Sequence, residues 1–226
     1  MKKIVLVILS LYGLQLHSQD WNFEKPDYKA IEKNIAEQSS NLFYPNLMDR
    51  FLKADSTLTL KEKRHLYYGY SFQENYSPYS RSDFADSLRV ILQLKTHDIL
   101  AFKKIITFGD SVLVKNPFAL RTLNYQLYAL DKTDNIRGYR KKMKQFNMII
   151  DALLSSGNGT TKEESFYVIY TSHEYDLLNI LGLTFGGSQS LIEHYDYLEL
   201  AEGETKIKGL YFDVTPCLNY MSKIYK

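Results

Sequence analysis

The residues best suited to chemistry lie in two short strings, HEYD and EHYD, each with an imidazole beside two carboxylates. Imidazole and carboxylate groups are ligands of transition metals, and together they also serve as acid–base pairs. If the two strings met in space, they could form the centre of a metal-assisted hydrolase with the residues His173, Glu174, His194 and Asp196. The alternative, which the sequence favours, is that both strings are solvated turn residues beside strands.

No signature of a catalytic family accompanies these strings. The chain has no G-x-S-x-G elbow, no H-E-x-x-H helix and no G-x-x-x-x-G-K-[ST] loop. The only cysteine, Cys217, cannot form an internal disulfide, and its apolar neighbours suggest a small buried side chain. The sequence therefore assigns no catalytic residue and no cofactor, and it favours a non-enzymatic role over an enzymatic one.

Tyrosine is abundant, with 19 tyrosines against one tryptophan. Amphipathic rings on a surface suit the recognition of glycans or peptides, because they offer contact area with little entropy to lose. A dense group that could form such a surface contains Tyr67, Tyr68, Tyr70, Tyr76 and Tyr79. The alternative is packing between helices with each hydroxyl bonded at the edge, and the sequence favours that alternative.

The elements that would position these residues begin with helices over residues 24–156. Apolar residues recur there at spacings of three and four, which is the period of an amphipathic helix. Thr59 and Glu62 form a capping box at the start of a helix that we expect to end near Gln73. Helix pairs separated by turns resemble tetratricopeptide-type hairpins, although the match is degenerate.

The pattern changes after the turn residues Ser155–Gly159. Beyond this boundary, Phe166–Tyr170, Tyr195–Leu200 and Leu210–Val214 have the composition of strands, whereas Leu177–Leu183 is ambiguous between strand and helix. The predicted fold class is α+β. Antiparallel helical hairpins over 24–156 would be followed by a small α+β unit over 160–226, with three or four strands packed on the helices.

The first 18 residues have the layout of a secretory signal peptide. Lys2 and Lys3 precede the mostly apolar run Ile4–Leu16, and Ser18 is a small residue suited to cleavage. This run is shorter than the roughly 20 residues that span a bilayer. We therefore expect an exported protein, periplasmic or extracellular, with no transmembrane helix in the mature chain.

Removal of this leader changes the charge balance. The complete chain has 28 basic and 26 acidic residues, a formal net charge of +2. Without Lys2 and Lys3 the basic count falls to 26, which equals the acidic count. A nucleic-acid partner therefore loses its compositional support. The local cluster of Arg140, Lys141, Lys142 and Lys144 lies along a predicted helix, and we interpret it as a solvated face.

Four strings spread over the chain resemble an uncharacterised secreted family of Bacteroidetes, the domain of unknown function 4919. They are Phe23–Tyr28, Tyr67–Tyr70, Ser188–Leu191 and Tyr211–Val214. The resemblance implies a secreted protein with a helical N-terminal part. It implies no activity, substrate or catalytic residue.

These observations favour a secreted, non-catalytic interaction module. Grooves between stacked helical hairpins commonly hold peptides or partner domains, so the partner would be a protein, a peptide or a glycan. The alternatives are the metal-assisted hydrolase of the two histidine strings and a glycan or peptide binder that uses the tyrosine cluster.

Overall fold

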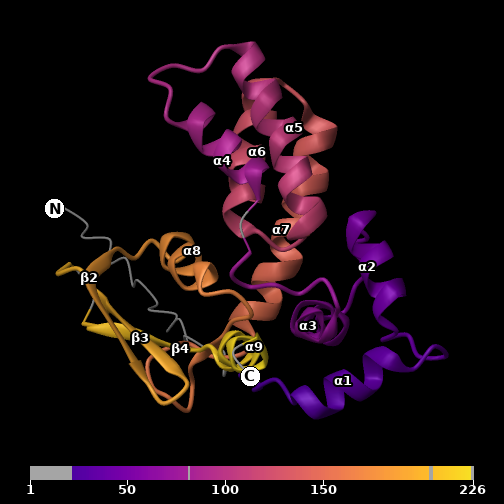
Figure 1. The fold of residues 1–226 in the computed structure, drawn as a ribbon, viewed down its shortest axis with the longest axis vertical. Helices are drawn as coiled ribbons and strands as arrows, with labels where there is room; N and C mark the ends of the chain where they lie inside the picture. Colours follow the sequence, from indigo (N-terminus) through magenta and orange to yellow (C-terminus); the bar gives the residue numbers. More distant parts are fainter. Residues whose placement is uncertain (1–21, 81, 204–205, 225–226) are drawn as a thin grey trace, which may run out of the picture.

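The computed structural model describes residues 22–80, 82–203 and 206–224, so the predicted signal peptide lies outside the described residues. Within those ranges the chain forms nine α-helices, a short 3-10 helix and a four-stranded sheet, which is the predicted α+β class (Figure 1). The helices are α1 (Tyr28–Ala36), α2 (Tyr44–Leu52), α3 (Leu60–Gly69), η1 (Tyr70–Phe72), α4 (Asp83–Leu92), α5 (Ile99–Lys115), α6 (Leu120–Lys132), α7 (Ile136–Leu154), α8 (Ser172–Ile180) and α9 (Thr215–Ile224). The strands are β1 (Phe166–Tyr167), β2 (Phe185–Ile192), β3 (Tyr195–Leu200) and β4 (Gly209–Asp213).

The capping box predicted for α3 is present. The Thr59 hydroxyl accepts a hydrogen bond from the Glu62 amide at 3.3 Å, and the Glu62 carboxylate accepts one from the Thr59 amide at 2.7 Å. Both groups therefore satisfy amides that the first turn of a helix leaves without partners. The α-helix ends at Gly69 and continues as η1 to Phe72, close to the predicted end.

The sheet has the order β1-β4-β3-β2. Strands β2, β3 and β4 pair antiparallel, whereas β1 pairs parallel with β4. Strand β3 has the predicted bounds. Strand β1 is shorter than predicted, with only two residues. After Val168 the chain leaves the sheet, and the next side chains pack into the core. The ambiguous segment Leu177–Leu183 contributes to helix α8 and the turn after it.

Two hydrophobic cores hold these elements together. The larger joins α1, α2 and α3 to the C-terminal half of α7 and to the sheet. The smaller lies between α4, α5 and α6. Figure 1 shows the corresponding arrangement, with α4 to α7 standing as an upright bundle above the sheet, α3 and α9. The helical region and the C-terminal region thus share one core.

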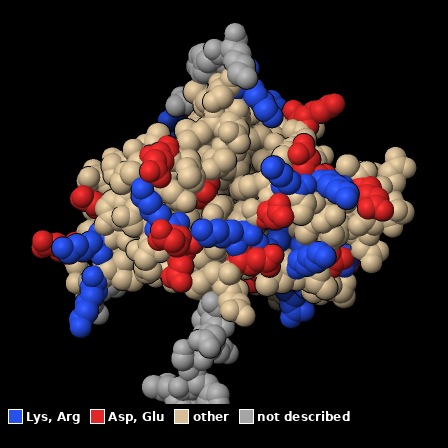
Figure 2. Space-filling model, turned by 90° about the horizontal axis from the view of Figure 1, so that it is seen from below, with Lys and Arg blue, Asp and Glu red and all other residues tan. Residues whose placement is uncertain are grey.

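The surface carries charges of both signs. Figure 2 shows lysine and arginine side chains interleaved with aspartate and glutamate over the face seen from below. Among the helices of the described ranges, none combines the length and apolar character that crossing a membrane would need.

Candidate functional site

The two histidine strings meet through their carboxyl groups, and their imidazoles point to other partners. Glu174 on α8 lies against Asp196 on β3. His173 is fully buried, with Nδ1 2.7 Å from the Tyr67 hydroxyl, whereas His194 is half-exposed, with Nε2 3.5 Å from an Asp213 carboxylate oxygen.

This arrangement does not form the four-residue centre expected from the sequence. In the parts of the chain that the structure describes, no group of three or more His, Cys, Asp or Glu side chains is placed to hold a metal ion. Residues His173 and Glu174 are adjacent in sequence, but on α8 their side chains contact different elements.

The carboxyl pair nevertheless has unusual electrostatics. Burial, together with the smaller effect of the neighbouring Asp196 carboxylate, raises the pKa of Glu174 to about 9. The Gln189 amide donates a hydrogen bond to Asp196 Oδ2 at 2.9 Å, and the Tyr175 hydroxyl donates to the Gln189 amide oxygen. At neutral pH, Glu174 is therefore a protonated acid held between α8 and the sheet, and neither of its oxygens has a hydrogen-bond partner among the described residues. Because Glu174 is 0% exposed, a substrate does not reach it.

The predicted tyrosine surface is also absent, because four of its five rings are buried. Tyr67, Tyr68, Tyr70 and Tyr76 belong to the larger core, and Tyr79 alone is exposed. The hydroxyl of Tyr68 donates to the Ala152 carbonyl at 3.0 Å, and that of Tyr76 donates to the Ile169 carbonyl at 2.7 Å. These rings pack between elements, so they cannot be exposed together to a glycan or a peptide.

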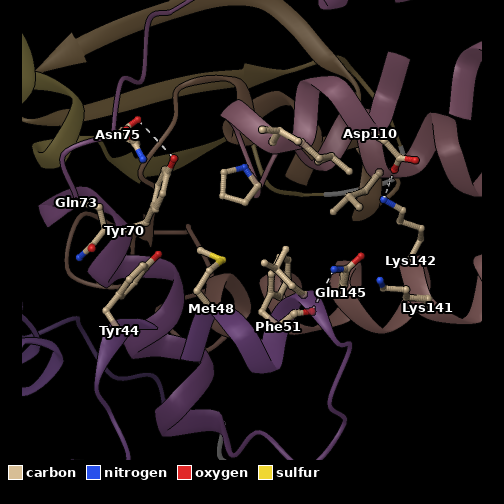
Figure 3. Close-up of a pocket in the computed structure, with 15 residues that line it drawn as sticks. Tyr44, Met48, Phe51, Tyr70, Gln73, Asn75, Asp110, Lys141, Lys142 and Gln145 are labelled. Atoms are coloured by element: carbon tan, nitrogen blue, oxygen red, sulfur yellow. Dashed lines mark hydrogen bonds and ion pairs between the residues drawn. The ribbon is translucent and has the colours of Figure 1, made fainter. Parts of the chain in front are cut away.

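A more accessible site is the groove of about 540 Å³ between α2, η1, α5 and α7, called here the α2–α7 groove (Figure 3). Helix α2 packs along α3 and meets α7 over a short stretch, which leaves the groove open on one side. Its apolar lining includes Met48 and Phe51 from α2 and Leu113 and Val114 from α5. Val114 is 84% exposed, so a ligand can reach it without rearrangement of the core.

Polar groups surround this apolar lining, as Figure 3 shows. At one end, Tyr44 stacks on Tyr70, with ring centroids 6.4 Å apart, and the buried Tyr44 hydroxyl has no partner among the described residues. Deeper in the groove, the Gln145 amide nitrogen donates to the Phe51 carbonyl at 3.1 Å, which leaves the buried amide oxygen of Gln145 without a partner. Buried polar atoms are normally hydrogen-bonded, so these two groups are unsatisfied hydrogen-bonding positions in the wall of the groove.

The opposite end of the groove is charged. Asp110 of α5 accepts hydrogen bonds from Lys142 of α7 and from Gln126, both at 2.8 Å. Lys141 also lines the groove but forms no ion pair with a described residue. The groove therefore combines an apolar centre, a hydroxyl-rich end and an end with one unpaired ammonium group.

A comparison of the chain with protein families found one family that matches most of its length. The family described as Domain of unknown function (DUF4919) matches residues 29–223. This segment contains all the helices and strands named above, apart from the first residue of α1 and the last residue of α9. The chain belongs to the DUF4919 family. The searches of curated proteins and of solved structures found no match. In this DUF4919 chain, the matched segment contains every residue that lines the α2–α7 groove.

Sequence reasoning missed the groove. Periodicity placed the apolar residues of α2 and α5 on the inner faces of helices, which is correct for Phe51, but it does not reveal that Val114 remains exposed. The available signal was the continuous apolar run at the end of α5, where Leu113 and Val114 are adjacent and cannot both face the core.

Proposed function

We propose that the protein is a non-catalytic binding module that holds a peptide segment of a partner in the α2–α7 groove. The observation that supports this most strongly is the unpartnered polar pair, the Tyr44 hydroxyl and the Gln145 amide oxygen, beside an open apolar lining. A peptide supplies both kinds of contact, because its side chains can occupy the apolar part while its backbone amides and carbonyls bond the polar groups.

Selection from a random peptide library tests this proposal. The full chain would be immobilised and exposed to a phage library of random dodecapeptides, and the affinity of enriched peptides would be measured by fluorescence anisotropy. We expect the enriched peptides to share closely spaced apolar residues. Their binding should weaken about tenfold or more in Val114→Glu, which places a charge in the groove at an exposed position.

A matched control separates groove binding from a general effect of the new charge. Val90 of α4 is also an exposed valine near the C-terminal end of a helix, and it does not line the groove. Val90→Glu should leave peptide affinity unchanged. Equal losses in both variants, or a library that yields no enriched peptide, would contradict the proposed function.

We also propose that the module acts outside the cytoplasm. This rests on the basic start and apolar run of residues 1–18 and on the neutral charge of the remaining chain. Intact-mass measurement of protein exported by a host cell should show a chain that begins near residue 19. A cytoplasmic product that retains Met1–Ser18 would contradict it.

A further inference from the structure

One face of α7 collects basic side chains that have no acidic partners. Arg137, Arg140, Lys141 and Lys144 are spaced at i, i+3, i+4 and i+7, which places them on the same side of the helix. All four are exposed, and none forms an ion pair with a described residue. Other basic residues of the chain do have acidic partners, as Lys63 does in Asp151 at 2.7 Å.

This clustering is unfavourable for the isolated chain. The N-terminal end of a helix carries a partial positive charge, and the first turn of α7 contains no acidic residue to balance it. In addition, like charges three and four residues apart on a helix repel each other. An ordinary solvated face does not explain why only positive charges gather here. A bound anionic ligand does, because it would neutralise them.

The basic face also borders a hollow of about 620 Å³. Lys53, at the C-terminal end of α2, lies on its other side, and the exposed side chains of α7 complete it. Lys141 lines both this basic hollow and the α2–α7 groove. One ligand can therefore contact the two sites at once.

We infer that Arg137, Arg140, Lys141 and Lys144 of the basic hollow receive the acidic side chains of the peptide whose apolar residues occupy the α2–α7 groove. Lys53, which pairs with Asp49 at 2.7 Å, closes the other side of the hollow. This inference rests on the proposed function and adds the chemical class of the partner. The ligand is a peptide segment in which apolar residues adjoin a run of aspartate or glutamate. The planar guanidinium groups of Arg137 and Arg140 can each hold a carboxylate through two hydrogen bonds.

The lining of the hollow favours an acidic peptide over other anionic macromolecules. It contains no aromatic side chain on which nucleic-acid bases could stack. Its nonpolar members are only Ala54 and Gly138, so it also lacks the large apolar side chains that enter a membrane interface. The apolar contacts lie instead in the neighbouring groove, where they suit peptide side chains.

The test compares each enriched peptide with a version in which every Asp and Glu is replaced by Asn and Gln. For the full-length wild-type chain, we expect the acidic peptide to bind about tenfold more tightly than its neutral version, and this advantage should shrink as salt is raised. The variant Arg140→Glu with Lys144→Glu should abolish the advantage and leave binding of the neutral version unchanged. Lys103→Glu with Lys104→Glu, an equal charge change on exposed residues of α5, should preserve it.

The possible failures can be told apart. Enriched peptides that depend on Val114 but contain no excess of acidic residues would overturn this inference and leave the proposed function intact. Peptides that bind independently of Val114 would overturn both. Stronger binding to a single-stranded oligonucleotide or to phosphatidylserine vesicles than to the acidic peptide would also overturn the inference.

Discussion

The Tyr67 hydroxyl lies 2.7 Å from Nδ1 of His173, and the two rings stack with centroids 5.8 Å apart. The hydroxyl accepts a hydrogen bond from the Ile169 amide at 3.3 Å, so its own proton is directed to the imidazole. Burial lowers the pKa of His173 to about 3, and the ring is therefore neutral at physiological pH. This pair joins α3 to α8 in the interior and acts as a structural contact.

Removal of the Tyr67 hydroxyl should destabilise the fold. Tyr67→Phe leaves both Nδ1 of His173 and the Ile169 amide buried without a partner, which we expect to lower the free energy of unfolding by about 1–3 kcal/mol. Urea denaturation measures this change. Tyr79→Phe is the control, because Tyr79 is exposed and its loss of a hydroxyl should have almost no effect. Similar losses in the two variants would contradict the role assigned to Tyr67.

Stability should depend on pH through two buried groups, Glu174 and His173, whose shifted pKa values change the free energy of unfolding in opposite directions. Folded Glu174 keeps its proton up to a pKa of about 9, against an ordinary value of 4.5, so the folded state binds more protons than the unfolded state in that window. Stability therefore falls with rising pH there, by up to about 1.4 kcal/mol per pH unit. His173, with a pKa of about 3 against an ordinary 6.5, makes stability rise with pH from 3 to 6.5.

The two contributions oppose each other between pH 4.5 and 6.5, so stability should be greatest in that interval and should fall above it. Glu174→Gln removes the titrating proton and keeps a side chain of the same size beside Asp196. We expect this variant to lose most of the decline between pH 6.5 and 9 in a series of urea denaturations. An unchanged decline would show that Glu174 is not its source.

The ion pair between Arg121 and Asp176 should matter more than those on the surface. Two guanidinium nitrogens of Arg121 lie 2.8 Å from Asp176 Oδ1, and the Asp176 side chain is buried. Burial raises the pKa of Asp176 from its ordinary value, and Arg121 opposes that rise. Arg121→Ala should lower stability by about 1–3 kcal/mol at pH 7 and by less at acidic pH, where Asp176 takes up a proton.

Arg89→Ala provides the comparison, because Arg89 and Asp86 form an ion pair at 3.1 Å between exposed side chains. Such pairs contribute about 0–1 kcal/mol. Calorimetry of both variants at pH 4 and pH 7 checks the prediction. If Arg121→Ala lost the same stability at both pH values, the unpaired Asp176 carboxylate would not be the cause of that loss.

Gly109 in the middle of α5 should resist replacement by alanine. Alanine favours helices over glycine by about 1 kcal/mol. However, a Cβ atom at this position would lie 2.7 Å from Cγ and Nε2 of Gln126, which is fully buried and donates to the Ile106 carbonyl and to Asp110. Displacement of Gln126 should outweigh the helical gain, so we expect Gly109→Ala to lower the melting temperature. A higher melting temperature would contradict this account of the contact between α5 and α6.

The fold followed from the sequence where local signals determine structure. The helices before residue 156 were predictable because apolar periodicity and capping are local, and the capping box of Thr59 is one example. Strand β2 was missed because Gly186, Gly187 and Ser188 give it little strand propensity, and its side chains are mostly exposed. Helix α9 was missed as well, although Pro216 in its first turn is a helix-start signal.

The candidate site was much less predictable, because it depends on tertiary contacts. The pairing of Glu174 with Asp196 was expected only as part of a larger centre, and nothing in the two strings indicates that their imidazoles turn away. The burial of Tyr68 and Tyr76 depends on carbonyl groups 84 and 93 residues away in the chain. The α2–α7 groove exists because α2 packs on α3 and leaves part of α5 and α7 uncovered, which no local pattern specifies.

The central claim is that the α2–α7 groove holds a peptide, and photo-crosslinking tests it most directly. An enriched peptide with benzophenone at an apolar position would be bound to the full chain, irradiated and mapped by mass spectrometry. We predict adducts on groove residues, with Met48 and Val114 foremost, and their loss in Val114→Glu. Adducts confined to residues outside the groove, such as strand β2 or Tyr79, would contradict the account.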